Sequence, residues 1–248
     1  MYYAYFRFYE ELNYFLPLDK RKVRFIHYFK GRASIKDMIE AIGVPHPEVD
    51  LILINGKSVD FSYIVQHQDE VSVYPVFESL DISKVTKLRE KPLRNVKFIL
   101  DVHLGKLAVY LRIFGFDVLY RNNFTDNDIV HIIEKDNRIL LTKDRGLLKR
   151  KIVTHGYCVR EINPKKQVIE IVKRFDLFNL IIPFSRCVHC NTILVKIEKQ
   201  EIIDKLLPRV KKFYNKFSFC PNCQKIYWQG SHYQSMMKFI EKIINSKL

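Results

Sequence analysis

Two Cys-x-x-Cys pairs near the carboxy terminus constrain the fold of this chain more than any other feature. Cys187 and Cys190 form the first pair, Cys220 and Cys223 form the second, and 29 residues separate the pairs. Together they offer four thiolates, the ligand set of a tetrahedral zinc site without an open coordination position. The intervening residues suffice for a strand, a loop and a returning strand, which predicts a zinc ribbon. Because such a closed site is structural, catalysis has to be sought elsewhere in the chain.

Two disulfides are the alternative use of these four cysteines, and they require an oxidising compartment. The first twelve residues lack the basic start, apolar stretch and cleavage site of an export signal, and no apolar run approaches the ~20 residues that span a bilayer. We therefore expect a cytoplasmic protein that holds zinc and has no membrane partner. The fifth cysteine, Cys158, is expected to be buried and inert.

The net charge of +15 is unevenly distributed along the 248 residues. Residues 1–80 hold 9 Lys and Arg against 11 Asp and Glu, a net charge of −2, whereas residues 81–248 hold 33 against 16, a net charge of +17. A domain with such an excess attracts polyanions and releases their counterions, which predicts nucleic acid as the partner. Composition alone leaves a merely solvated basic surface as the alternative.

Residues 1–80 follow the element order of a β-grasp, or ubiquitin-like, domain. Apolar alternation and turn residues predict strands around residues 3–8, 23–29, 51–53 and 71–74. A helix over residues 35–42 is expected between the second and third strands, beginning at Ser34 and ending at Gly43. Residues 81–95 carry basic side chains with little apolar periodicity, which predicts a basic linker and a domain boundary.

From Val96 the pattern changes to strands that alternate with helices, which predicts an α/β domain with a parallel sheet over residues 96–183. The carboxyl ends of such strands are where sites lie. Asp101 and Asp144 each follow an apolar strand, and Asp126 stands at a helix start. Three converging carboxylates repel one another unless a divalent cation lies among them, and their hard oxygen atoms suit Mg²⁺ or Mn²⁺. The pattern predicts a metal-dependent nuclease, with turn or helix capping as the alternative role.

Basic side chains near these acids are the candidate contacts for RNA phosphate. They are Lys106, Arg112, Lys143 and Arg145. Further along the chain, helices are expected over residues 167–178 and 234–246, so that residues 184–248 form the zinc ribbon and a terminal helix.

Five motifs in chain order resemble the Mut-seven C-terminal ribonuclease family. They are FILDVHLGKLA (98–108), LRIFGFD (111–117), RILLTKD (138–144), RCVHCN (186–191) and YWQGSH (227–232). This resemblance implies a PIN-like nuclease fold with a fused zinc ribbon. The segments GVPHPEVD (43–50), LILING (51–56) and VYPVF (73–77) resemble the ubiquitin-like domain found ahead of that nuclease.

The resemblance places the family's acidic pocket on Asp101, Asp126 and Asp144, and the zinc ligands on the four paired cysteines. It leaves open whether Asp128 replaces Asp126, and whether Asp117 or Asp128 is a fourth acidic ligand. Lys143 stands where arginine is common in the family. The ubiquitin-like part lacks the Gly-Gly tail of sulfur carriers, so a docking or packing role is expected for it.

We therefore expect a Mg²⁺- or Mn²⁺-dependent ribonuclease that acts on tRNA or another structured RNA. A non-catalytic RNA-binding or ribosome-associated factor is the alternative. A third reading is a toxin-like tRNA nuclease restrained by a protein partner on the ubiquitin-like domain. Because residues 1–80 carry no basic excess, RNA affinity is expected to reside in residues 81–248.

Overall fold

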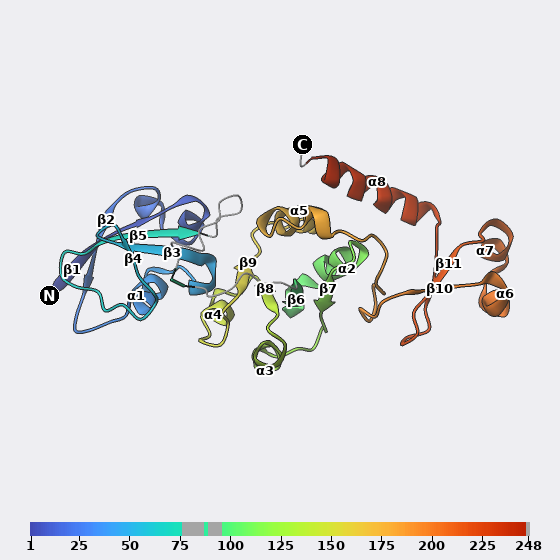
Figure 1. Cartoon of the computed structure of the whole chain (residues 1–248), viewed down its shortest axis with the longest axis horizontal. Helices are drawn as coiled ribbons and strands as arrows, with labels where there is room; N and C mark the ends of the chain where they lie inside the picture. Colours follow the sequence, from blue (N-terminus) through green and yellow to red (C-terminus); the bar gives the residue numbers. More distant parts are fainter. Residues whose placement is uncertain (76–86, 89–95, 247–248) are drawn as a thin grey trace. The chain divides into compact units, whose positions relative to one another are not determined.

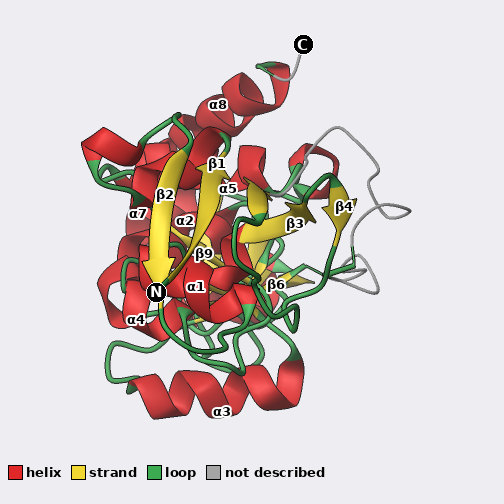
Figure 2. Ribbon diagram, turned by 90° about the vertical axis from the view of Figure 1, so that its left-hand side faces the viewer, coloured by secondary structure: helices red, strands yellow, loops and turns green. Residues whose placement is uncertain are grey.

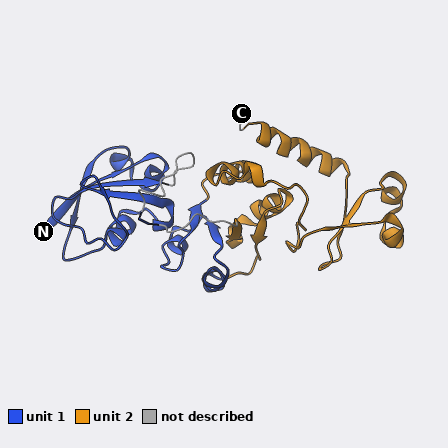
Figure 3. Ribbon diagram, in the orientation of Figure 1, with its two compact units in different colours: residues 1–95, 125–158 blue, residues 96–124, 159–248 orange. Residues whose placement is uncertain are grey.

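The computed structural model of this chain describes residues 1–75, 87–88 and 96–246. The predicted basic linker, residues 81–95, lies outside the described residues except for Lys87 and Leu88. The chain divides into two compact units, one of residues 1–95 and 125–158, the other of residues 96–124 and 159–248 (Figure 3). Residues 125–158 thus group with the amino-terminal residues, and the domain boundaries expected from the sequence stay a prediction.

The amino-terminal part of the first unit is the expected β-grasp fold, a five-stranded sheet in the order β2-β1-β5-β3-β4 (Figures 1 and 2). β1 and β5 run parallel at its centre, and the other pairings are antiparallel. The elements are β1 (Tyr2–Phe8), the 3-10 helices η1 (Glu10–Phe15) and η2 (Leu18–Lys20), β2 (Phe25–Phe29), α1 (Ile35–Ile42), η3 (His46–Glu48), β3 (Val49–Ile54), β4 (Lys57–Ser58) and β5 (Glu70–Pro75).

Local sequence explains why these elements begin and end where they do. Alternate residues of β1 are buried, so Phe6 and Phe8 enter the core on one face of the strand. The Ser34 hydroxyl accepts a hydrogen bond from the Asp37 backbone N–H at the start of α1. The helix ends at Gly43, whose φ of +123° is open to glycine and strained for other residues.

The rest of the first unit consists of α3 (Asp126–Asp136), β8 (Ile139–Thr142), α4 (Arg145–Leu148) and β9 (Gly156–Cys158). β8 and β9 pair in parallel, with Thr142 opposite Cys158. Every residue of β8 and β9 is buried, as expected for a parallel sheet covered on both faces. Cys158 is 3% exposed, in agreement with the expected buried thiol.

The second unit begins with another parallel pair of strands. Its first elements are β6 (Lys97–Leu100), the 3-10 helix η4 (Val102–Leu104), α2 (Gly105–Ile113), β7 (Asp117–Leu119), α5 (Pro164–Arg174) and the 3-10 helix η5 (Phe178–Leu180). Lys97 lies opposite Asp117 in the register of β6 and β7. α2 and α5 pack against each other. α5 begins at Pro164, three residues before the expected start, and the Asn163 side chain caps it.

The zinc ribbon is a three-stranded antiparallel sheet in the order β10-β11-β12. Its elements are β10 (Val195–Ile197), α6 (Lys199–Ile202), the 3-10 helix η6 (Ile203–Lys205), α7 (Pro208–Phe213), β11 (Phe217–Phe219), β12 (Ile226–Trp228) and the terminal helix α8 (Ser231–Asn245). The link between β10 and β11 was expected to be a loop, but it contains two short helices. They pack through a small apolar cluster of Ile202, Val210 and Phe217.

Candidate active site and zinc centre

The four paired cysteines come together in the second unit, as the sequence predicts. Their Sγ atoms all lie within 4.8 Å of one another, with Cys187 and Cys220 buried. The closest cross-pair separations are 3.5 Å for Cys187 with Cys223 and 3.3 Å for Cys190 with Cys220. A disulfide would need about 2.0 Å, whereas four sulfur atoms at about 2.3 Å from one zinc ion lie roughly 3.8 Å apart. The donor set and its spacing therefore fit a closed tetrahedral zinc site.

Both Cys-x-x-Cys turns are built by the same two backbone hydrogen bonds. In the first, the Asn191 N–H donates to the Cys187 carbonyl, and the Cys187 N–H donates to the Thr192 carbonyl. In the second, Gln224 and Lys225 take the corresponding positions relative to Cys220. Asn191 and Gln224 both adopt left-handed backbone conformations, with φ of 70° and 57°. The backbone thus shapes each turn so that its two thiols face the same point.

Neighbouring hydroxyl groups interact with two of the thiols. The Cys190 and Thr192 side chains lie 3.3 Å apart. Burial favours the neutral thiol of Cys190, but hydrogen bonds with the side chain and backbone of Thr192 and with the Cys220 and Cys187 thiols together outweigh it and lower the pKa of Cys190 to about 5. The Tyr227 hydroxyl lies 3.1 Å from Cys187 Sγ, and burial, followed by that thiol, raises the pKa of Tyr227. Tyr227 is therefore a protonated partner of the zinc site.

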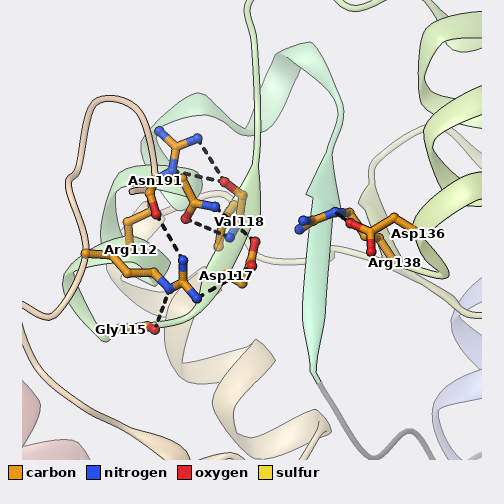
Figure 4. A network of polar contacts seen from close by, with 8 residues as sticks. Arg112, Gly115, Asp117, Val118, Asp136, Arg138 and Asn191 are labelled. Atoms are coloured by element: carbon orange, nitrogen blue, oxygen red, sulfur yellow. Dashed lines mark hydrogen bonds and ion pairs between the residues drawn. The ribbon is translucent and has the colours of Figure 1, made fainter. Parts of the chain in front are cut away.

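Arg112 belongs to the support of the first cysteine pair, and its expected role as a phosphate contact is corrected. It is 4% exposed. Its Nε and Nη2 donate to the Val118 carbonyl (Figure 4). Its Nη1 donates to the carbonyls of Val188 and His189 between the two cysteines. A buried guanidinium that is occupied by three carbonyls cannot also bind a phosphate in solution.

Asp117 is likewise engaged next to the first cysteine pair (Figure 4). Its carboxylate accepts a hydrogen bond of 2.9 Å from the Asn191 side chain and lies 3.5 Å from the Arg186 guanidinium. Asp117 also opens β7 opposite Lys97, whereas Asp101 follows the far end of β6. The two acids therefore lie at opposite ends of this strand pair. Asp117 is excluded as a fourth ligand beside Asp101.

Asp101 lies directly after β6 and is 4% exposed. Its Oδ1 accepts a hydrogen bond of 2.8 Å from the His103 backbone N–H, and the His103 ring lies 3.4 Å from the same oxygen. The expected capping role is thus real, because Asp101 begins η4.

The first turn of α3 separates the roles of Asp126 and Asp128. Asp128 closes a capping box, because its carboxylate accepts from the Thr125 N–H and hydroxyl at 2.9 and 2.7 Å. These bonds hold the pKa of Asp128 below its ordinary value, and the bond from the Thr125 backbone contributes most. Asp126 is exposed in the same turn. Asp126 and Asp128 were the two candidates for the third acidic ligand. The carboxylate of Asp128 caps the helix, whereas that of Asp126 does not.

Asp144 follows β8 and caps α4 through Oδ1, which accepts from the N–H groups of Gly146 and Leu147 at 2.6 and 3.3 Å. The Asp144 N–H in turn donates to the Thr142 hydroxyl. Lys143 and Arg145 flank it and are exposed, as is Lys106 on α2. Asp126 and Asp144 belong to the first unit and Asp101 to the second.

Two family models match the chain. The model of the Mut7-C RNAse domain matches residues 96–240, more than half of the chain. The chain belongs to the Mut7-C RNAse family. The model of the Mut7-C ubiquitin domain matches residues 1–81, ahead of it. Searches of curated proteins and of solved structures gave no match.

The Mut7-C RNAse match covers all three predicted acids and all four cysteines. The expected family and domain order are confirmed, and the family is one of ribonucleases. None of the described helices combines the length and the apolar character needed to cross a membrane.

Proposed function

We propose that this Mut7-C protein is a Mg²⁺- or Mn²⁺-dependent ribonuclease that hydrolyses phosphodiester bonds in tRNA or another structured RNA. The observation that carries this proposal is the RNAse-domain match over the residues that include Asp101, Asp126 and Asp144. The net charge of +17 in residues 81–248 supports a polyanionic substrate.

The chemistry of the three acids suits the proposed metal. Carboxylate oxygens are hard ligands of the kind that Mg²⁺ and Mn²⁺ prefer. Backbone N–H groups orient two of the carboxylates, His103 acting on Asp101 and Gly146 on Asp144. A divalent cation bound there would orient a water molecule for in-line attack and offset the charge that develops on the phosphate. Exposed Lys106, Lys143 and Arg145 are the proposed phosphate contacts.

A non-catalytic RNA-binding or ribosome-associated factor is the rival function, because the same basic charge would serve binding without cleavage. The two functions make different demands on the acids. A nuclease needs the negative charge of Asp101 and Asp144, whereas a binding protein is relieved of repulsion when that charge is removed.

Asparagine substitutions test the proposal with little risk to the fold. In Asp101→Asn and Asp144→Asn the side-chain oxygen still caps the next helical turn, because asparagine is as good a cap as aspartate. We expect cleavage of RNA in Mg²⁺ or Mn²⁺ to fall roughly 100-fold or more, while the thermal midpoint and RNA affinity are kept. Asp136→Asn, at the carboxyl end of α3, is the control that should cleave normally.

Two outcomes would count against the nuclease. Wild-type protein that binds RNA but cleaves none of a broad panel with either metal favours the binding factor. Cleavage that persists in the double asparagine variant places the active site elsewhere or identifies a contaminant.

A further inference from the structure

The ubiquitin-like domain contacts the segment that follows Asp144 within the first compact unit. Lys149 Nζ donates at 2.6 Å to the Glu40 carbonyl in the last turn of α1, where the helix dipole favours a cation. The Cys158 N–H donates at 2.6 Å to Oε1 of Glu48, whose side chain is fully buried. These bonds connect the ubiquitin-like domain to the end of α4 and to the last residue of β9.

A third contact involves Arg145, the residue directly after Asp144. Its Cζ lies 5.3 Å from the ring centroid of Tyr14 and 5.1 Å from that of Phe15. Both distances are within the range of about 6 Å for attraction between a cation and a ring. The two rings meet edge to face with centroids 5.5 Å apart. Phe15 is buried and Tyr14 is 43% exposed. The guanidinium therefore lies against a pair of rings, one of which belongs to the domain core.

Arg145 differs from Arg112 in how its hydrogen-bond donors are used. Arg112 donates to three carbonyls. Among the residues that the structure describes, Arg145 is exposed and its guanidinium donates to no carbonyl or carboxylate. A guanidinium presents its donors in a planar fork that matches the oxygen atoms of a phosphate. Arg145 is thus held in place by rings that leave its donors available.

The surrounding charge also favours an anion. Residues 143–151 contain five Lys and Arg and one acid, Asp144. A flexible basic side chain loses rotamer entropy when it binds a phosphate, and a group already held against a ring loses less. The ring contact therefore lowers the entropy cost of phosphate binding by Arg145 and leaves its positive charge intact.

We propose that the ubiquitin-like domain forms one wall of the RNA site, in which Tyr14 and Phe15 hold Arg145 ready to bind a phosphodiester group of the RNA next to Asp144. This inference rests on the proposed function only in its choice of RNA as the ligand. It departs from the expectation that RNA affinity resides entirely in residues 81–248. Tyr14 and Phe15 are positioning residues that act through Arg145.

A double-mutant cycle on the full-length protein tests the inference. Binding of a short fluorescently labelled single-stranded RNA is measured in Ca²⁺, at several salt concentrations, with intact RNA verified on a gel. Arg145→Gln should lower the slope of log K against log[salt] by about 0.7, the value for one phosphate contact on a single strand. Tyr14→Leu should weaken binding about twofold to fivefold while the slope stays unchanged, because the charge remains.

The double variant decides between a positioning role and a direct one. If Tyr14 acts through Arg145, then Tyr14→Leu has no further effect in the Arg145→Gln background. Tyr14→Phe keeps the ring and should restore wild-type affinity. Tyr28→Leu, which removes a tyrosine that is 56% exposed on β2, is the matched control and should bind normally. Equal thermal midpoints would show that the variants are folded.

Two results would overturn the inference. If Tyr14→Leu weakens binding equally in both backgrounds, then Tyr14 contacts RNA on its own. If Tyr14→Leu tightens binding, then the ubiquitin-like domain masks Arg145. The ribonuclease activity is tested separately. A protein that shows the expected coupling between Tyr14 and Arg145 but never cleaves RNA would contradict the proposed catalytic function and still support this phosphate site.

Discussion

The guanidinium of Arg112 joins parts of the chain that are more than 70 residues apart. It ties the β7 backbone at Val118 to the turn between Cys187 and Cys190. Three carbonyl groups accept hydrogen bonds from it. A buried carbonyl that is left without a donor costs about 1–3 kcal/mol. Arg112 therefore connects the zinc site to the strand pair that leads to Asp101.

Replacing Arg112 separates this structural role from phosphate binding. We expect Arg112→Ala to lower the free energy of unfolding by roughly 3 kcal/mol, through unsatisfied carbonyls and lost packing. Urea denaturation measures this change. The salt dependence of RNA binding by the folded variant should equal that of wild type. Lys106→Gln, at an exposed position on the same helix, should leave the free energy of unfolding unchanged and reduce the salt dependence of RNA binding.

The capping role of Asp128 can be tested through the pH dependence of stability. Its folded-state pKa lies below the ordinary value of 3.8 because Thr125 donates to the carboxylate. The stabilisation is present above that ordinary value and is lost as the pH falls through the lower folded-state pKa. We expect Asp128→Asn to be less stable than wild type above about pH 4, with a difference that vanishes in stronger acid, as followed by urea unfolding at each pH.

Asp128→Asn should also retain RNA cleavage, while Asp126→Asn should lose it. Loss of cleavage in Asp128→Asn with normal activity in Asp126→Asn would reverse the assignment of the third acidic ligand.

Sequence patterns pointed to the three acids as candidates but missed the contacts of Arg112, and the reason is physical. A carboxylate after an apolar strand is a local pattern, visible within the five residues from Lys97 to Asp101. The partners of Arg112 at Val188 and His189 are 76 and 77 residues away. Position on a helix shows that a basic residue is near a site, but it does not show which carbonyls the fold brings to it.

At the scale of elements, the two cysteine turns hold the ribbon together. The apolar cluster of Ile202, Val210 and Phe217 is small, so we expect metal binding to provide most of the folding energy of this module. We expect one zinc ion per chain, and we expect Cys220→Ala to unfold the ribbon, since zinc contributes on the order of 10 kcal/mol to such modules.

Metal analysis and limited proteolysis of residues 184–246 check this prediction. Cys158→Ala is the control, because it removes the thiol outside the cluster and should leave the zinc content unchanged. Folded, reduced protein without zinc would contradict the assignment.

Elements with strong local signals were predictable, and short ones were not. Ser34 and Gly43 mark both ends of α1, and the Asn55-Gly56 turn marks the hairpin from β3 to β4. α6 and α7 have only four and six residues, which is too short for a helical period to be seen. Pro208 at the first position of α7 is the one local signal that could have revealed it.

At the scale of the whole molecule, the first compact unit is discontinuous in sequence. Residues 1–95 and 125–158 form it, while residues 96–124 belong to the second unit. Glu48 and Cys158 make one of the connections inside this unit. Sequence alone gives no sign of this, because the element order predicts a self-contained β-grasp domain followed by a separate nuclease.

Glu48 allows this connection to be measured. Glu48→Leu would leave the buried Cys158 N–H without its acceptor, so we expect the free energy of unfolding to fall by about 1–3 kcal/mol. Glu48→Gln keeps a carbonyl oxygen in the same place and should lose less. Urea unfolding followed by tyrosine fluorescence makes the comparison. Equal stability of the leucine variant and wild type would show that the bond contributes nothing.

The sequence separation of 110 between Glu48 and Cys158 also sets an order in time. During synthesis the β-grasp strands leave the ribosome first, and at about 5–20 residues per second the chain that carries Cys158 follows roughly 5–20 s later. During that interval the Glu48 carboxylate has no Cys158 N–H to accept from, and the rings of Tyr14 and Phe15 have no Arg145 to hold. The face of the amino-terminal domain that carries Glu48, Tyr14 and Phe15 is therefore exposed to water or to a chaperone until β9 has been synthesised.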